Sequence, residues 1–64
     1  MKEIVIMIEE SEFELYNGSF VRLTTSKPET YIGRLHNKDK HWVEIKTTSG
    51  ILIHIDKKDV QKII

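Results

Sequence analysis

The chain has 64 residues, ten lysines and arginines balanced by ten aspartates and glutamates, and no cysteine. This length allows a single small domain, and the absence of cysteine excludes a disulfide framework and a thiolate zinc site. No apolar run approaches the roughly 20 residues of a membrane helix and no signal peptide is visible, so we expect a cytoplasmic protein without a membrane segment.

The N-terminal quarter fits more than one structure. Ile4–Ile8 is a short, largely β-branched run that favours a strand. The next segment, SEFELY at residues 11–16, fits a helix that opens with a capping box and stops at Gly18. It also fits a strand that turns at Asn17-Gly18, which is a strong hairpin signal. We favour the hairpin, and we expect residues 1–17 to form an N-terminal extension or an extra strand or hairpin.

Five later segments show the period-two alternation of apolar and polar residues that is typical of half-buried strands. Turns rich in Pro, Asn, Asp, Ser and Gly separate them, and Asp56–Asp59 is expected to be a polar turn or a single 3₁₀ turn. Gly33, inside the second segment, indicates a sharp bend or a close approach of two backbones. The expected strands are Phe20–Thr25, Thr30–His36, His41–Thr47, Ile51–Ile55 and Val60–Ile64.

Short strands joined by tight turns predict an all-β antiparallel fold. At this length the sheet must curl on itself to enclose a core, so we predict one small, strongly bent barrel of five or six strands. The chain lacks alanine and is rich in isoleucine, which also argues against a helical protein. The same composition suggests an AT-rich genome, such as that of a low-GC bacterium or its phage.

Residues at the bends of these strands form two motifs. The first motif consists of Tyr31, Gly33, Leu35, Asp39, His41 and Trp42. The apolar positions of the second motif are Ile55, Val60 and Ile63, and both motifs are preceded by Gly18 and Val21. In these residues and in strand order the chain resembles the Sm/LSm family, which includes bacterial Hfq. The resemblance implies an Sm-like, SH3-type barrel over residues 18–64. It also implies a homo-oligomeric ring and a non-enzymatic, cofactor-free module that binds RNA or a nucleotide.

Departures from the family pattern bear on its RNA site. The Asn of the first motif is Val43 here, and the Arg-Gly of the second is Asp56-Lys57. The family uses those positions to hold a uracil edge and a phosphate. It also usually starts with a helix, where we expect a strand. His41 keeps the position whose ring stacks on a base in the family, although an exposed turn histidine is the simpler interpretation.

Basic residues are concentrated in the second half of the chain. Residues 33–64 hold seven lysines and arginines against four acids, and residues 1–32 hold three against six. On a barrel the basic residues can converge on a patch that contacts phosphates. They can also form an ordinary solvated surface or complement the acidic half of another subunit. The candidate nucleic-acid contacts are His41, Arg34, Lys38, Lys40, Lys57 and Lys58.

Apolar residues also lie on the polar faces of the predicted strands. Trp42 points away from its apolar neighbours if alternation holds, and we favour its burial at a subunit interface. Ile32 and Leu52 also lie on the faces opposite their apolar neighbours, and we assign them to the same interface, since a ring-forming strand presents apolar residues on both faces. The alternative function is a protein–protein interaction module, such as a phage or regulatory accessory factor, that kept the barrel without RNA binding. A weaker alternative is a small-molecule or nucleotide sponge that binds between subunits.

Metal binding and catalysis find little support in the sequence. His36 and His41 bracket a four-residue turn, but a structural zinc site normally takes four ligands. We therefore expect no metal. The chain has no glycine-rich phosphate loop, nucleophile elbow or HExxH motif, and we predict that it is not an enzyme.

Overall fold

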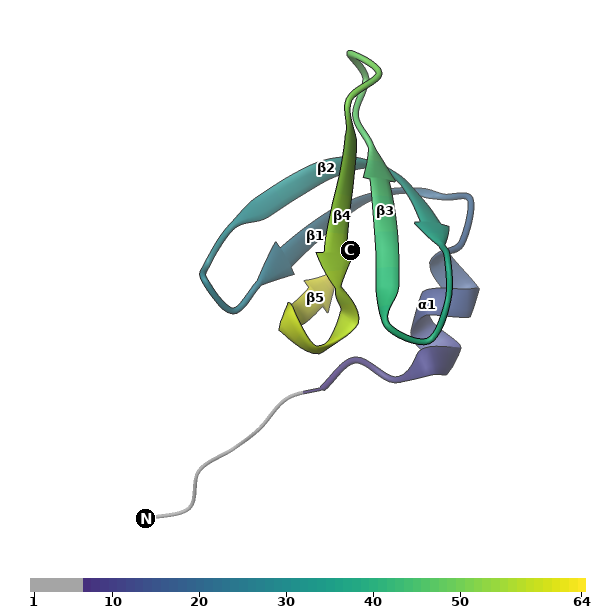
Figure 1. Cartoon of the computed structure of the whole chain (residues 1–64), viewed down its shortest axis with the longest axis vertical. Coiled ribbons are helices and arrows are strands. Elements are labelled where there is room, and N and C mark those ends of the chain that lie inside the picture. The colour runs from purple at the N-terminus through teal and green to yellow at the C-terminus, as the bar shows by residue number, and fades with distance from the viewer. Residues whose placement is uncertain (1–6) are drawn as a thin grey trace.

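The computed structural model describes residues 7–64 as one five-stranded antiparallel sheet with one short helix and one 3₁₀ turn (Figure 1). The predicted all-β class with a small bent sheet is confirmed. Most of the strand predicted at Ile4–Ile8 lies outside the described residues, and Met7 and Ile8 are not in a strand. In chain order the elements are α1 (Glu10–Tyr16), β1 (Phe20–Thr25), β2 (Thr30–Asn37), β3 (Trp42–Lys46), β4 (Leu52–Asp56), the 3₁₀ turn η1 (Lys57–Asp59) and β5 (Val60–Ile63).

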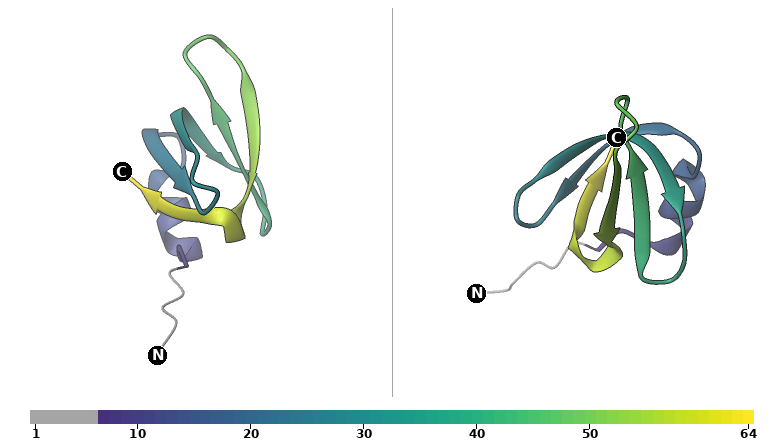
Figure 2. Two further views of the ribbon diagram at one scale, coloured as in Figure 1. Left: turned by 90° about the vertical axis from the view of Figure 1, so that its left-hand side faces the viewer. Right: turned by 45° about the horizontal axis from the view of Figure 1, so that its top comes forward.

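The strands follow the order β4-β3-β2-β1-β5 in the sheet. Strands β1 to β4 pair with their sequence neighbours, whereas β5 returns to β1, with Leu23 opposite Ile63. The register shifts between Thr24 and Thr25, and such a bulge bends its strand. In Figures 1 and 2 the β3–β4 hairpin stands steeply across β1 and β2, and β5 crosses below them. The sheet therefore curls around its inner face, and β4 and β5 remain its two edges.

The inner face carries the residues that alternation assigned to the core. Val21 and Leu23 of β1 and Val43 and Ile45 of β3 are all buried. Burying an aliphatic or aromatic side chain of this size contributes about 1.5–3 kcal/mol, so the cluster is the main source of stability. The buried cluster consists of Phe13, Val21, Leu23, Leu35, Val43, Ile45, Ile55, Val60 and Ile63.

Gly33 permits the close approach that the sequence indicated. It lies opposite Val21 in the β1–β2 pair. A Cβ atom at this position would overlap the backbone carbonyl of Lys46 and would lie 2.7 Å from Cγ2 of Ile45. Because backbone cannot move aside as a side chain does, only glycine fits at this close approach of β2 to β3.

The hairpin predicted for residues 11–16 is wrong, because this segment forms helix α1. The capping box of the helical alternative is not formed either, since Glu9 is the N-cap residue and makes no side-chain cap bond. Phe13 is only 1% exposed and joins the core, so burial of this ring outweighs the strand pattern. Among residues 7–64, no helix has the length and apolar character needed to cross a membrane.

The end of α1 is fixed to β2. Gly18 has a φ of 85°, the left-handed conformation that commonly follows a helix. Its N–H donates to the carbonyl of Leu35 at 2.7 Å. The side-chain oxygen of Asn17 accepts from the N–H of Asn37 at 2.8 Å, and the Asn37 side-chain amide donates to Glu14 at 2.6 Å. The helix is thereby held against one end of the sheet.

Candidate nucleic-acid interface

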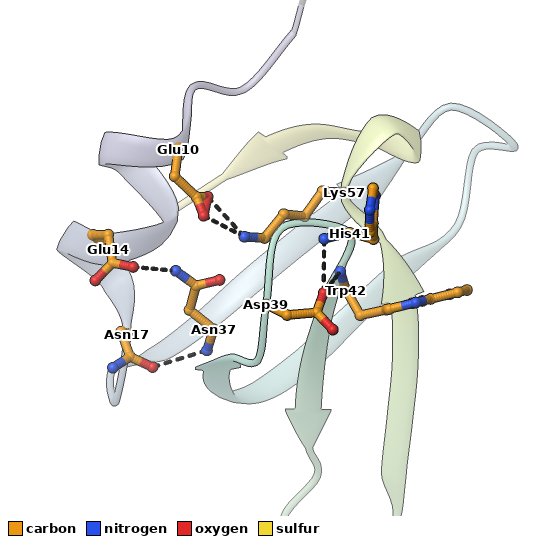
Figure 3. Close-up of polar contacts among 8 residues, drawn as sticks. All are labelled: Glu10, Glu14, Asn17, Asn37, Asp39, His41, Trp42 and Lys57. Atoms are coloured by element: carbon orange, nitrogen blue, oxygen red, sulfur yellow. Dashed lines mark hydrogen bonds and ion pairs between the residues drawn. The ribbon is translucent and has the colours of Figure 1, made fainter.

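Asp39 shapes the loop between β2 and β3. One of its carboxylate oxygens accepts from the N–H of His41 at 2.7 Å and from the N–H of Trp42 at 3.0 Å (Figure 3). These two hydrogen bonds hold the pKa of Asp39 below its usual 3.8, the bond from His41 having the largest effect. The loop therefore presents His41 and Trp42 from a backbone that an ionised aspartate fixes.

The junction between β4 and η1 meets this loop. Asp56 caps η1 by accepting from the N–H of Lys58. The N–H of Lys57 donates to the carbonyl of His41 at 2.8 Å. This bond brings Lys57 and Lys58 close to Lys40 and His41, which lie far from them in the sequence.

A hollow of about 420 Å³ lies where the loop, the junction and α1 meet. Four of the six predicted nucleic-acid contacts line it, and Lys40, His41 and Lys58 are exposed to solvent there. Phe13, Met7 and Ile8 provide apolar surface. We call this the loop hollow, and its lining residues are Met7, Ile8, Glu10, Phe13, Lys40, His41, Asp56, Lys57 and Lys58.

Lys57 differs from the other lysines of residues 7–64 because it is buried, at 8% exposure. Its ammonium group contacts both carboxylate oxygens of Glu10, at 2.5 and 2.7 Å (Figure 3). It also lies 5.0 Å from the centre of the Phe13 ring, within the range of a cation–π contact. The carboxylate of Glu10 is therefore already paired with the ammonium group of Lys57, which was predicted to contact phosphate.

The other two predicted contacts lie elsewhere. Arg34 faces outward from β2, opposite Phe20 and Lys46, and donates to the carbonyl of Gly18 at 2.6 Å. Lys38 lies 3.8 Å from the carboxylate of Glu44. The structure therefore brings together His41, Lys40, Lys57 and Lys58, and it does not bring Arg34 and Lys38 to the same hollow.

The predicted interface residues are exposed on the outer face of the sheet. Trp42 is 46% exposed, and Ile32 and Leu52 are exposed to a similar degree. They do not form one continuous patch, because Arg34 and Lys46 lie between Leu52 and Ile32 across the strands, and the pair Glu44 and His54 separates Leu52 from Trp42 along the strands. Their exposure is what an interface requires before assembly, and their burial between subunits stays a prediction.

Glu44 lies between two histidines on the same outer face. His36 of β2 and His54 of β4 are its neighbours across the sheet, so His36, which brackets the turn with His41 in the sequence, lies opposite Glu44. Among residues 7–64, no three His, Cys, Asp or Glu side chains are placed to hold a metal ion. The Nε2 atom of His54 is 2.8 Å from a carboxylate oxygen of Glu44.

Glu10 and Phe13 are among the residues of the loop hollow that sequence reasoning did not place there. Both lie on α1, in the segment that was assigned to an N-terminal extension or hairpin. The helical reading of the same segment was the signal that could have placed them near the barrel. Searches of protein-family models, curated proteins and solved structures found no match for this chain.

Proposed function

We propose that this chain is a non-enzymatic, Sm-like module that binds single-stranded RNA or a nucleotide in the cytoplasm. The observation that carries the proposal is the hydrogen bond between Lys57 and His41, which joins the β2–β3 loop to the β4–η1 junction. These are the two places that the resemblance to the Sm/LSm family assigns to RNA contact. Helix α1, followed by the five-strand sheet, also supports the likeness, because the family usually starts with a helix.

The loop hollow offers the two kinds of contact that an unpaired nucleotide uses. The exposed ring of His41 can stack on a base, and Lys40 and Lys58 can contact the flanking phosphates. Stacking of one base contributes about 1–3 kcal/mol, so one hollow supports only weak binding. Val43 in place of the family's Asn removes the usual hydrogen bond to a base edge, and we therefore expect little base selectivity.

Assembly of several copies would place several loop hollows along one RNA strand. The sheet leaves β4 and β5 as edges, and an edge strand can pair with the opposite edge of a second copy. Repeated head-to-tail pairing of this kind closes into a ring if the rotation allows it. Native mass spectrometry at low micromolar concentration measures this directly: a closed ring supports the proposal, and a monomer removes the basis for tight RNA binding.

The direct test is the binding of a dye-labelled oligouridine, followed by fluorescence anisotropy at two salt concentrations. We expect binding that weakens as salt rises, because phosphate contacts release counterions. Replacing His41 by Ala, and Lys40 and Lys58 together by Ala, should each weaken it. Lys27→Ala is the matched control, since Lys27 lies in the β1–β2 turn away from the loop hollow. Equal effects of all these variants would refute the assignment of the site.

The exposed outer face supports a second candidate, the protein–protein interaction module. Phe20, Ile32, Trp42 and Leu52 are all about half exposed on this face, and residues of these types are common in interface cores. Under this proposal RNA does not bind at low salt, and a partner protein binds in a manner insensitive to salt. Trp42→Ala should then abolish the interaction.

A further inference from the structure

A second hollow, of about 340 Å³, lies on the outer face of the β3–β4 hairpin. Its lining residues are Lys38, Asp39, Trp42 and His54. The volume is at the lower end of the range of about 300–1,000 Å³ that small-molecule sites occupy. We call it the outer hollow; it shares no lining residue with the loop hollow.

A buried carboxylate organises the outer hollow. The side chain of Glu44 is only 10% exposed, and it contacts His54 at 2.8 Å and Lys38 at 3.8 Å. The bond from His54 and the charge of Lys38 hold the pKa of Glu44 below its usual 4.5, against the effect of burial. One ionised group therefore positions both a ring and a cation at the rim of the hollow.

Trp42 supplies the planar surface of the outer hollow. It lies diagonally across from His54 on the same face of the β3–β4 pair. Its side chain points away from Glu10 and Lys57, that is, away from the loop hollow (Figure 3). An indole with this exposure, next to a lysine, offers base stacking and phosphate contact together.

Both hollows are built on the same short loop. Lys40 and His41 line the loop hollow, and Lys38, Asp39 and Trp42 line the outer hollow. Asp39 accepts hydrogen bonds from the backbone N–H groups of His41 and Trp42, and it thereby fixes the backbone that carries both rings. A strand of nucleic acid that crosses this loop meets one ring and at least one lysine on each side of it.

We propose that the outer hollow binds a second nucleotide of the same single-stranded RNA, with its base stacked on Trp42 and its phosphate contacted by Lys38. His54, held by Glu44, lies beside the base as a second ring. This inference rests on the proposed function and adds to it a path for the RNA, from the loop hollow over residues 38–42 to the outer face. Lys38 is the cation at the rim that suits a phosphate, and the carboxylate of Asp39, which also lines the hollow, accepts from the N–H groups of His41 and Trp42.

The test uses the emission of Trp42, which is the only tryptophan of the chain. Unlabelled oligouridine is titrated into the full chain at low salt while tryptophan emission is recorded. Total binding is followed in parallel by the anisotropy of a dye-labelled oligouridine. We expect quenching of the emission that saturates together with the anisotropy.

Two variants, each of one exposed lysine, form a matched pair. Lys38→Ala should weaken the affinity obtained from the quenching titration by about 2- to 5-fold, the usual effect of one exposed ionic contact. Lys46→Ala is the control, because Lys46 is an outward-facing lysine of β3 that does not line the outer hollow. In the anisotropy assay, Trp42→Ala should weaken binding by about 5- to 150-fold, the loss of one stacked base, and Trp42→Phe should recover part of it. Circular dichroism checks that each variant is folded.

The possible outcomes separate this inference from the function on which it rests. If labelled RNA binds but the emission stays constant and Trp42→Ala binds normally, the outer hollow is not a nucleotide site and the proposed function stands. If labelled RNA does not bind at all, both proposals fail. If the emission changes on dilution of the protein without RNA, a second copy covers the indole, and the outer hollow is an interface instead.

Discussion

The contact between Glu10 and Lys57 makes a quantitative prediction about stability. Glu10→Gln leaves the ammonium of Lys57 buried without a carboxylate. Breaking a fully buried ion pair costs about 3–5 kcal/mol, and an exposed pair contributes only about 0.2–1 kcal/mol. Lys57 is 8% exposed but the Glu10 side chain is 56% exposed, so we expect an intermediate loss of about 2 kcal/mol. For a domain of this size the melting temperature should fall by about 8–16 °C.

The control is Glu12→Gln in the same turn of α1. Both glutamates lie in the first turn of the helix, so each variant loses the same favourable interaction with the helix dipole, about 0.3–1 kcal/mol. Only Glu10 contacts Lys57. Thermal and urea unfolding of the two variants, followed by circular dichroism, should therefore show a clearly larger loss for Glu10→Gln.

A double variant tests the cause of the loss. Lys57→Met keeps an unbranched side chain against Phe13 and removes the buried charge, and exchanging buried charges for apolar groups is often neutral. The double variant Glu10→Gln/Lys57→Met should then be more stable than Glu10→Gln alone. Equal losses for the two glutamates, or no rescue by Lys57→Met, would refute the reasoning.

Three further predictions follow from the fold. Gly33→Ala should destabilise the protein by about 1–3 kcal/mol or prevent folding, because the added carbon overlaps the backbone of β3; a urea midpoint equal to wild type would contradict this. The pKa of Glu44 is lowered in the folded state, so its contribution to the free energy of unfolding is complete above pH 4.5 and is lost as the pH falls below that value. In Glu44→Gln the free energy of unfolding should therefore fall less steeply on acidification. The part of the fall that is due to Asp39 should remain. Asp39→Ala should loosen the loop and speed amide exchange at His41 and Trp42, measured by NMR, because both N–H groups lose their acceptor; unchanged exchange there would show that the loop holds its shape without the carboxylate.

The strands were predictable from the sequence because their signal is local. Alternation placed Val21, Leu23, Val43 and Ile45 on the core face, and the structure buries all four. Each strand was bounded by turn residues, and strands β1 to β4 pair with their immediate neighbours. Prediction of strands β1 to β4 therefore needed no information about distant contacts, and their positions agree with the structure to within one residue at each end.

Helix α1 was mispredicted because its local pattern is ambiguous. Phe13 and Leu15 are two residues apart, as on one face of a strand, and Asn17-Gly18 is a hairpin signal. The structure resolves the ambiguity through contacts far along the chain: Phe13 enters the core, Glu10 meets Lys57, and the end of the helix bonds to β2. No window of neighbouring residues contains that information.

Only part of the candidate site was predictable, because some of its contacts also join residues that are far apart in the chain. The resemblance to a family motif drew attention to His41, and composition drew attention to the lysines. Burial of Lys57 and Glu44 could not be predicted, because each is a charged residue that becomes buried only when a partner from another element covers it. Their partners, Glu10 and His54, lie on elements that meet only in the folded chain.

The pairing of β5 with β1 has a consequence for the rate and order of folding. Strands β1 to β4 form a meander of short-range contacts, which small proteins assemble quickly. The β1–β5 pair instead joins Leu23 to Ile63, so its formation closes a loop that contains β2, β3 and β4. The chain loses the conformational entropy of this loop before the contacts of the pair form. Substitutions of buried residues in β2 and β3 should therefore slow folding, whereas substitutions in β5 should mainly accelerate unfolding. The last strand then sets how long the folded state persists more than how quickly it is reached.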